Sequence, residues 1–373
     1  MSVARIASRH FKVLFPAFVL IVSLVTMAEG QDGELKDLER LANKALGRGD
    51  YVEASHHLRV ALDLAEARKA SDTDMVVILG NLAEMLRSAM QYGEAEKFFD
   101  RALGILRTSN TADKRHLPVI LGNQGRLYQE TGRYALSESV LKKAQRLTER
   151  DLGPGHWSMP QVLNSLGVLY TSIKKRKDAE TSFKKAIALE EKREPQNGFL
   201  APILGNLGGL YEDERRWSHA EAVLLRALEI AEVFYGENHP ETVTILNKLA
   251  MSYKGQEKLE ESARIFRRAL AARRKVFDPE DGTVTLTLLS LARVLAAQGN
   301  YDEARSNYTE TLQLMEKNLG PKSAAVVVTL EEFAKLLRRM KNRNEEALAM
   351  ETRAKFIRAE TMYTVKVGKA RRE

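Results

Sequence analysis

The sequence predicts an all-α protein, an α-solenoid in which about eight helix-turn-helix units stack in one continuous array. A phrase that begins Leu79-Gly80-Asn81-Leu82 returns at intervals of 41 or 42 residues, and two columns of small residues follow each copy. A fixed period of this size is typical of a stacked array of one small unit. The length of 373 residues alone would suggest two or three domains, but no linker or shift in composition divides residues 34–362.

The first half of each unit has the apolar spacing of a helix. In the copy that begins at Leu79, apolar or small residues follow at Leu82, Ala83 and Leu86, three, four and seven positions later. This spacing places them on one helical face. The leading leucines of the seven clear copies are Leu79, Leu121, Leu163, Leu204, Leu246, Leu288 and Leu330. A degenerate copy around Leu38 and Leu41 precedes them, as expected of a terminal unit.

The second half of each unit predicts a second helix that packs closely on the first. Small residues separated by seven positions lie on one stripe of a helix and let a neighbouring helix approach to roughly 8 Å. The first of the two columns contains Ala54, Ala95, Ser137, Ala179, Ala220, Ser262, Ala304 and Ala347. The second contains Ala61, Ala102, Ala144, Ala186, Ala227, Ala269, Thr311 and Ala354. Glycines mark several turns between the two helices, at Gly49, Gly132 and Gly299.

These columns divide the chain into units that can be taken in order. The predicted units are residues 34–74, 75–116, 117–158, 159–199, 200–241, 242–283, 284–325 and 326–362. In the first unit we expect helices near 34–47 and 51–68, and Gly153-Pro154-Gly155 must end the second helix of the third unit. The last helix is expected from Glu345 to about Met362, where exposed basic residues would cap the array. Residues 363–373 are expected to form a basic tail.

This pattern resembles the tetratricopeptide repeat. Its period is longer than the usual 34 residues. Phrases between units, such as Leu152-Gly-Pro-Gly-His156 and Tyr235-Gly-Glu-Asn-His-Pro240, resemble the longer subtype of kinesin light chains and many bacterial relatives. The resemblance covers residues 34–362 and implies a right-handed superhelix whose first helices line a concave groove. It also implies a protein or peptide as the partner that occupies the groove.

Carried onto this chain, the groove positions of the family contain asparagines and glycines. A carboxamide both donates and accepts hydrogen bonds, so it could hold the backbone of an extended peptide, or it could satisfy neighbouring helices instead. The candidate asparagines are Asn81, Asn123, Asn164, Asn206 and Asn247. Mid-helix glycines on the groove floor would admit a peptide backbone or, equally, allow close helix packing; they are Gly80, Gly122, Gly205 and Gly209.

Basic residues complete the candidate site. Arg126 occupies a groove position in the third unit, and Arg293, Lys335, Arg338 and Arg339 make the far end of the groove basic. That end could hold an acidic segment or a terminal carboxylate, or it could be a solvated face. The family's clamp for acidic chaperone tails needs a lysine where this chain has Glu39, so that ligand is not expected.

The amino-terminal 30 residues predict export. Arg5, Arg9 and Lys12 precede an apolar run of sixteen residues from Val13 to Ala28, and small residues follow. This is the pattern of a cleaved signal peptide, which would make the protein periplasmic or secreted. The alternative is an uncleaved segment that anchors the protein to a membrane, although the run is shorter than the roughly 20 residues that a spanning helix needs.

Composition and motifs argue against several functions. The chain has no cysteine, which excludes disulfides, Cys-ligated zinc and a lipidated cysteine. Six of the eight net positive charges lie in the two ends, so the array gives little support for binding nucleic acid. No metal-ligand spacing, phosphate loop, dinucleotide fingerprint or nucleophile elbow is present, so we expect no cofactor, no metal and no catalysis. The favoured function is an exported interaction scaffold; the alternative is a membrane-anchored assembly factor.

Overall fold

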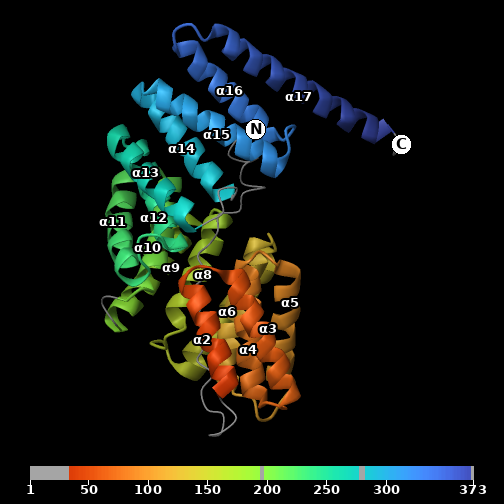
Figure 1. Ribbon diagram of the computed structural model, residues 1–373. Helices are drawn as coiled ribbons and strands as arrows, with labels where there is room; N and C mark the ends of the chain where they lie inside the picture. Colours follow the sequence, from red (N-terminus) through yellow and green to blue (C-terminus); the bar gives the residue numbers. More distant parts are fainter. Residues whose placement is uncertain (1–32, 194–196, 277–281, 371–373) are drawn as a thin grey trace. The chain divides into compact units, whose positions relative to one another are not determined.

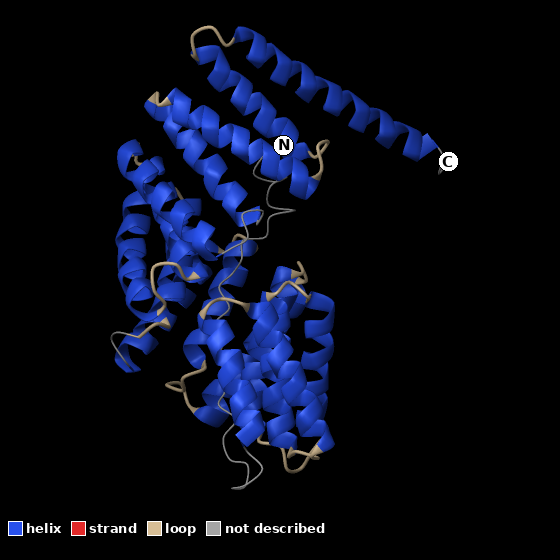
Figure 2. Ribbon diagram, in the orientation of Figure 1, coloured by secondary structure: helices blue, strands red, loops and turns tan. Residues whose placement is uncertain are grey.

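The computed structural model describes residues 33–193, 197–276 and 282–370. Within these ranges the chain forms sixteen α-helices and two short helical turns, and contains no strand (Figure 2). The helices lie in consecutive packed pairs. The prediction of an all-α solenoid is therefore confirmed.

The described residues form two compact units, 33–242 and 243–370. The helices of the amino-terminal unit are α2 (Gly33–Gly47), α3 (Tyr51–Ala67), α4 (Asp72–Ser88), α5 (Tyr92–Thr108), η1 (Lys114–His116), α6 (Leu117–Glu130), α7 (Tyr134–Leu147), η2 (Thr148–Leu152), α8 (Met159–Ser172), α9 (Arg176–Arg193), α10 (Leu200–Asp213) and α11 (Trp217–Phe234) (Figure 1). Helix α12 (Pro240–Gly255) begins at the boundary. The carboxy-terminal unit continues with α13 (Leu259–Val276), α14 (Gly282–Gln298), α15 (Tyr301–Leu319), α16 (Ala324–Arg339) and α17 (Asn344–Ala370).

The turn inside each helix pair has one conformation throughout the chain. One residue of each turn has a positive φ in the left-handed region; these residues are Gly49, Met90, Gly132, Lys174, Arg215, Glu257, Gly299 and Asn342. In the first seven turns the following N–H donates to the carbonyl five residues earlier, as in Arg133 to Tyr128 at 2.7 Å and Arg216 to Tyr211 at 2.8 Å. This pattern is the Schellman motif, which satisfies helix carbonyls that would otherwise lack a donor.

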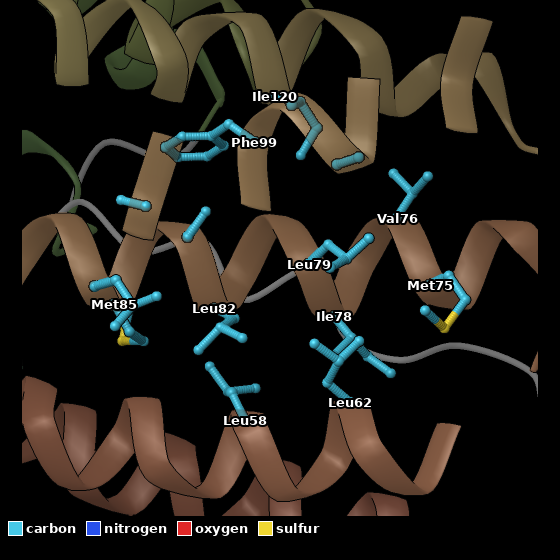
Figure 3. Packing of buried hydrophobic residues seen from close by; sticks show 14 of the residues in the cluster. Leu58, Leu62, Met75, Val76, Ile78, Leu79, Leu82, Met85, Phe99 and Ile120 are labelled. Carbon is cyan, nitrogen blue, oxygen red and sulfur yellow. The ribbon is translucent and has the colours of Figure 1, made fainter. Parts of the chain in front are cut away.

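Within each compact unit, the core lies between the two helices of a pair and between successive pairs. Figure 3 shows Leu58 and Leu62 of α3 next to Leu82 and Ile78 of α4, while Phe99 of α5 packs from the other side. These side chains are buried, and burial of a leucine of this kind contributes roughly 1.5–3 kcal/mol. The small-residue columns let the helices come this close, since Ala54, Ala61, Ala95 and Ala102 are fully buried.

A glycine at the centre of several first helices is required by this packing. A Cβ at Gly167 would lie 2.5 Å from the Phe183 ring, and a Cβ at Gly208 would lie 2.6 Å from Leu224. Real side chains do not approach so closely, so any larger residue would push the second helix away. The glycines therefore set the distance between the helices of a pair.

An arginine directly after the turn of a helix pair connects that pair to the preceding one. It contacts an aromatic ring of its own first helix and a glutamate of the preceding second helix. The Arg133 guanidinium lies 4.4 Å from the centre of the Tyr128 ring and binds Glu96 of the preceding pair at 2.6 and 2.9 Å. Arg216 does the same with Tyr211 at 4.2 Å and Glu180 at 3.0 Å. Cation–π contacts and partly exposed ion pairs contribute about 0.5–1 kcal/mol each, so this ladder stabilises the stacking modestly.

The last helix carries a polar residue where every earlier pair has a large apolar one. Tyr308 of α15 occupies this position in the seventh pair and stacks on Phe333 of α16 at 5.4 Å. In α17 the equivalent residue is Glu351, which pairs with Arg338 at 3.1 Å. A polar outer face of this kind ends a solenoid. Helix α17 continues to Ala370, through most of the segment that we expected as a basic tail.

Candidate functional site

The first helices of the amino-terminal unit line a hollow. Helices α4, α6, α8 and α10 contact one another in sequence, which places the same groove position of successive pairs side by side. The hollow lies across α6, α8 and α10. It is lined by Val119, Gly122, Asn123, Arg126, Ser158, Gln161, Val162, Asn164, Ser165 and Ile203. Four of the predicted site residues, Gly122, Asn123, Arg126 and Asn164, are therefore brought together.

The predicted asparagines have different environments. Asn123 is half-buried at the wall of the hollow, and Asn164 accepts a hydrogen bond from the Asn206 amide at 3.1 Å. Asn81 is buried. In the carboxy-terminal unit, Asn247 donates to the Val243 carbonyl at 2.9 Å and accepts from Thr287 at 3.1 Å. Asn164 of α8 and Asn206 of α10 thus form a hydrogen-bonded pair beside the hollow. The Asn247 side chain instead bonds to the backbone of its own helix, α12, and to a side chain of the next first helix, α14.

The groove glycines differ in how much space surrounds them. A Cβ at Gly80 would lie 2.4 Å from the Ile120 side chain, so this glycine permits close packing of α4 and α6. A Cβ at Gly122 would lie 3.6 Å from Val162, an ordinary contact, so packing does not require glycine there. Gly205 is buried and Gly209 is half-buried. Gly122 is therefore the groove glycine whose small size keeps the hollow open.

Four charged side chains form a network at one end of the hollow. Arg87 donates to both carboxylate oxygens of Glu84, at 2.9 and 2.8 Å, and also pairs with Glu130. Arg126 binds the same Glu84 at 3.1 Å. Arg87 and Glu84 are only 1% and 2% exposed. This alternation of charge leaves the network neutral, which buried ionic groups require.

The electrostatics of the network distinguish its two arginines. Burial acts to lower the pKa of Arg87, but the charges of Glu130 and Glu84 outweigh it and raise that pKa. The pKa of Arg126 is lowered, first by burial and then by repulsion from Arg87. Arg126 is also the more exposed of the two, at 14%, and it lines the hollow. Of the four groups, Arg126 is therefore the one that lines the hollow.

The basic residues of the carboxy-terminal unit are largely paired with glutamates. Arg293 donates to both oxygens of Glu332 at 2.7 and 2.9 Å, and Arg338 donates to both oxygens of Glu351 at 3.2 and 3.1 Å. Lys335 is exposed on the same helix, α16. Lys254 of α12 is half-buried, and burial followed by repulsion from Arg293 lowers its pKa. This surface therefore carries less free positive charge than the sequence indicates.

Sequence reasoning missed part of the lining. Gln161 and Ser158 lie before the leading leucine of their unit, outside the groove positions carried over from the family. Gln161 precedes Asn164 by three residues, so the two share a helical face. This spacing could have identified Gln161. Ser158 is at the start of α8, where a loop rather than a periodic helix sets its position.

Two further features of the described ranges concern metals and membranes. Residues 33–193, 197–276 and 282–370 hold no group of three acidic or histidine side chains placed to bind a metal ion. No helix in the same ranges combines the length and apolar character needed to cross a bilayer. The predicted export segment, residues 1–30, lies outside the described residues.

Comparison with known proteins identifies the repeat. A model of the tetratricopeptide repeat matches residues 116–192, 199–275 and 283–355, more than half of the chain. Kinesin light chain TPR-like repeats from Podosopora anserina have a TM-score of 0.50 at 18% identity, covering 55% of this chain and 98% of that one. A second crystal structure of those repeats also has a TM-score of 0.50, at 17% identity, with coverages of 56% and 100%.

The structure of Pseudomonas aeruginosa pilF has a TM-score of 0.48 at 20% identity, covering 66% of this chain and 98% of pilF. Among curated proteins, none matches the sequence significantly. Similarity at these identities shows the fold alone.

Proposed function

Because this chain belongs to the tetratricopeptide repeat family, we propose that it is an exported, non-catalytic scaffold that binds a partner protein or peptide. Repeats of this family indicate protein–protein interaction. We propose further that the partner binds in the hollow across α6, α8 and α10. The observation that carries it is the lining, where carboxamides and a guanidinium surround an apolar floor.

This lining suits the backbone of an extended peptide. The Asn123 and Asn164 carboxamides offer both donors and acceptors, which match peptide groups in either direction. Arg126 adds a charge-assisted donor for a carbonyl or carboxylate, and Val119, Val162 and Ile203 offer apolar contact for side chains. Main-chain hydrogen bonds would give affinity, while the apolar contacts would give specificity.

Filling the hollow tests the proposal. Gly122→Leu places a large side chain at the floor and is expected to reduce capture of the natural partner by at least about tenfold, since a blocked groove excludes the peptide. Gly104→Leu is the matched control. A Cβ at Gly104 in α5 meets nothing within 4 Å, and this residue is not part of the lining.

The measurement compares partner recovery by affinity capture from source cells, using full-length wild type and both variants, with helicity checked by circular dichroism. Equal recovery by the wild type and a folded Gly122→Leu variant would place the partner outside this hollow.

The proposal of export is tested separately. The support is the basic head and apolar run within residues 1–30. The intact mass of the protein recovered from its source should correspond to a chain that begins near Glu29 or Gln31. A full-length mass together with recovery in the membrane fraction would instead indicate an uncut anchor. Full-length protein in the soluble cytoplasm would contradict export in both forms.

A further inference from the structure

The first turn of the amino-terminal unit touches a loop nearly 200 residues away. The turn between α2 and α3 contains Gly49, and Leu46 lies in the last turn of α2. His239 ends the loop that follows α11, and Pro240 is the first residue of α12. A Cβ at Gly49 would lie 2.5 and 2.9 Å from Cγ and Cδ of Pro240, so the proline ring packs directly on the Gly49 backbone. Gly49 also has a φ of 74°, which glycine adopts without strain.

His239 adds a polar contact to this apolar one. Its Nδ1 accepts a hydrogen bond from the Glu241 N–H at 3.2 Å, so the proton of the neutral ring is on Nε2. The backbone of Leu46 also faces the ring, and its carbonyl acts to raise the pKa of His239. His239 stacks on Tyr235 at 4.9 Å, and the Tyr235 hydroxyl donates to the Gly198 carbonyl at 2.6 Å. The loop is therefore fixed at its start by the Tyr235 bond to Gly198 and at its end by the contact of Pro240 with Gly49.

We propose that Leu46, Gly49, His239 and Pro240 form a clasp that closes the five amino-terminal helix pairs into a ring, and that protonation of His239 releases the clasp. The chemical reason lies in the tautomer. A second proton on the ring would occupy Nδ1 and face the Glu241 N–H, so two donors would oppose each other where one hydrogen bond now exists. The clasp is a property of the fold and does not depend on the identity of a partner.

The surroundings of His239 favour its neutral form. The titratable groups near it are Tyr235 on its own loop, Glu241 at the start of α12, and Tyr51 from α3, whose hydroxyl acts on Tyr235. Burial lowers the pKa of His239 from 6.5 to about 4, against the opposing effect of the Leu46 carbonyl. Because the closed form has the lower pKa, acid favours opening. Between pH 8 and pH 5 the opening equilibrium should rise on the order of thirtyfold.

Hydrogen exchange across the clasp tests the contact. In the full-length protein, Gly49→Ala should raise the exchange of amides 236–242 by about tenfold or more, because the new methyl group displaces the Pro240 ring. Gly132→Ala is the matched control. Gly132 has the same turn position and a φ of 77°, but a Cβ there meets nothing within 4 Å. It should leave amides 236–242 as protected as in the wild type.

Two further comparisons complete the experiment. Adding Pro240→Ala to Gly49→Ala should lower the exchange of amides 236–242 toward the level of Pro240→Ala alone, since the clash is removed. His239→Gln retains a donor but cannot titrate in this range, so exchange corrected for intrinsic rates should no longer rise between pH 8 and pH 5. The same effect of Gly49→Ala and Gly132→Ala on the distant loop would overturn the clasp. An unchanged acid response in His239→Gln would overturn its release by protonation.

Discussion

At the scale of single residues, the turns show how backbone hydrogen bonds override side-chain preference. Lys174 and Arg215 have φ values of 66° and 59°, in a region that costs a residue with a Cβ about 1–2 kcal/mol. The Schellman hydrogen bonds impose that conformation at the first seven turns, whether or not glycine is present. The turns without glycine therefore hold a small amount of strain.

Replacing one of these residues by glycine should stabilise the protein. Lys174 is exposed, and Lys174→Gly should raise the free energy of unfolding by about 0.5–1 kcal/mol, since relief of strain exceeds the added entropy of the unfolded chain. The reverse change, Gly132→Lys, should lower it by about 1 kcal/mol. Urea denaturation with an unchanged m-value measures both. A lower midpoint for Lys174→Gly would show that the turn is unstrained.

The turns also show what the sequence could and could not predict. Gly49, Gly132 and Gly299 marked three turns correctly, because glycine is a local signal. Met90, Lys174, Arg215 and Glu257 carry no such signal, since their conformation comes from hydrogen bonds between helix ends. Likewise, Gly122 was a candidate on position alone, and only the distances to its neighbours separate it from Gly80, where the end of the Ile120 side chain occupies the space of a Cβ.

At the scale of elements, α4 and α6 are joined by charge as well as by apolar packing. Arg87 of α4 contacts Glu84 on its own helix and Glu130 on α6, and it is 1% exposed. Removing one partner from such a network leaves a buried charge without compensation, which costs about 3–5 kcal/mol. The partly exposed pair of Arg133 with Glu96 is screened by solvent and contributes far less.

This contrast gives a prediction for two arginine-to-alanine variants. Arg87→Ala should lower the free energy of unfolding by about 3–5 kcal/mol, and Arg133→Ala by about 1 kcal/mol or less, because only the first leaves two buried carboxylates with the charge of a single arginine, Arg126, to balance them. Denaturation in 0.1 M and 1 M salt measures both. The loss in Arg133→Ala should shrink at high salt, while that in Arg87→Ala persists. Similar losses in the two variants would mean that water reaches the network.

The sequence predicted Arg126 as a groove residue, but it could not show the network around it. Glu84 and Arg87 are three residues apart, so a pair within one helix was foreseeable. The contact with Glu130 on the next first helix depends on how α4 and α6 pack, and Ile120 of α6 packs against Gly80 of α4 there. The pairing of Arg293 with Glu332 likewise joins two successive repeats, α14–α15 and α16–α17, so the sequence of one repeat alone could not predict it.

At the scale of the whole molecule, the period of the sequence predicted the stack of helix pairs but not the contacts between distant pairs within the amino-terminal unit. Each pair contributes a small rotation to a superhelix, and contacts between distant pairs depend on the sum of these rotations. The contact of Gly49 with Pro240 is such a contact within the amino-terminal unit. His239 was placed in an inter-unit loop from sequence, yet its half-buried position near Leu46 could not be derived from a repeat pattern.

Two groups in the amino-terminal unit should make it less stable in acid, over different ranges of pH. The pKa of His239 is lowered to about 4, so its contribution is present above 6.5 and is lost as the pH falls toward 4. A hydrogen bond from Lys184, with others from Arg216 and Tyr211, lowers the pKa of Glu180 to about 2. Its contribution is present above 4.5 and is lost as the pH falls toward 2.

Thermal unfolding of three proteins separates the two ranges. Between pH 7 and pH 4.5 the wild-type Tm should fall by about 5 °C more than that of His239→Gln, because this variant has no histidine to protonate at the clasp. Below pH 4.5 the Glu180→Gln variant should lose less stability than the wild type, since its ladder contact no longer titrates. The variants act on groups held by different elements, so their effects should add. Parallel curves for the wild type and His239→Gln above pH 4.5 would mean that His239 is equally solvated in the folded and unfolded chains.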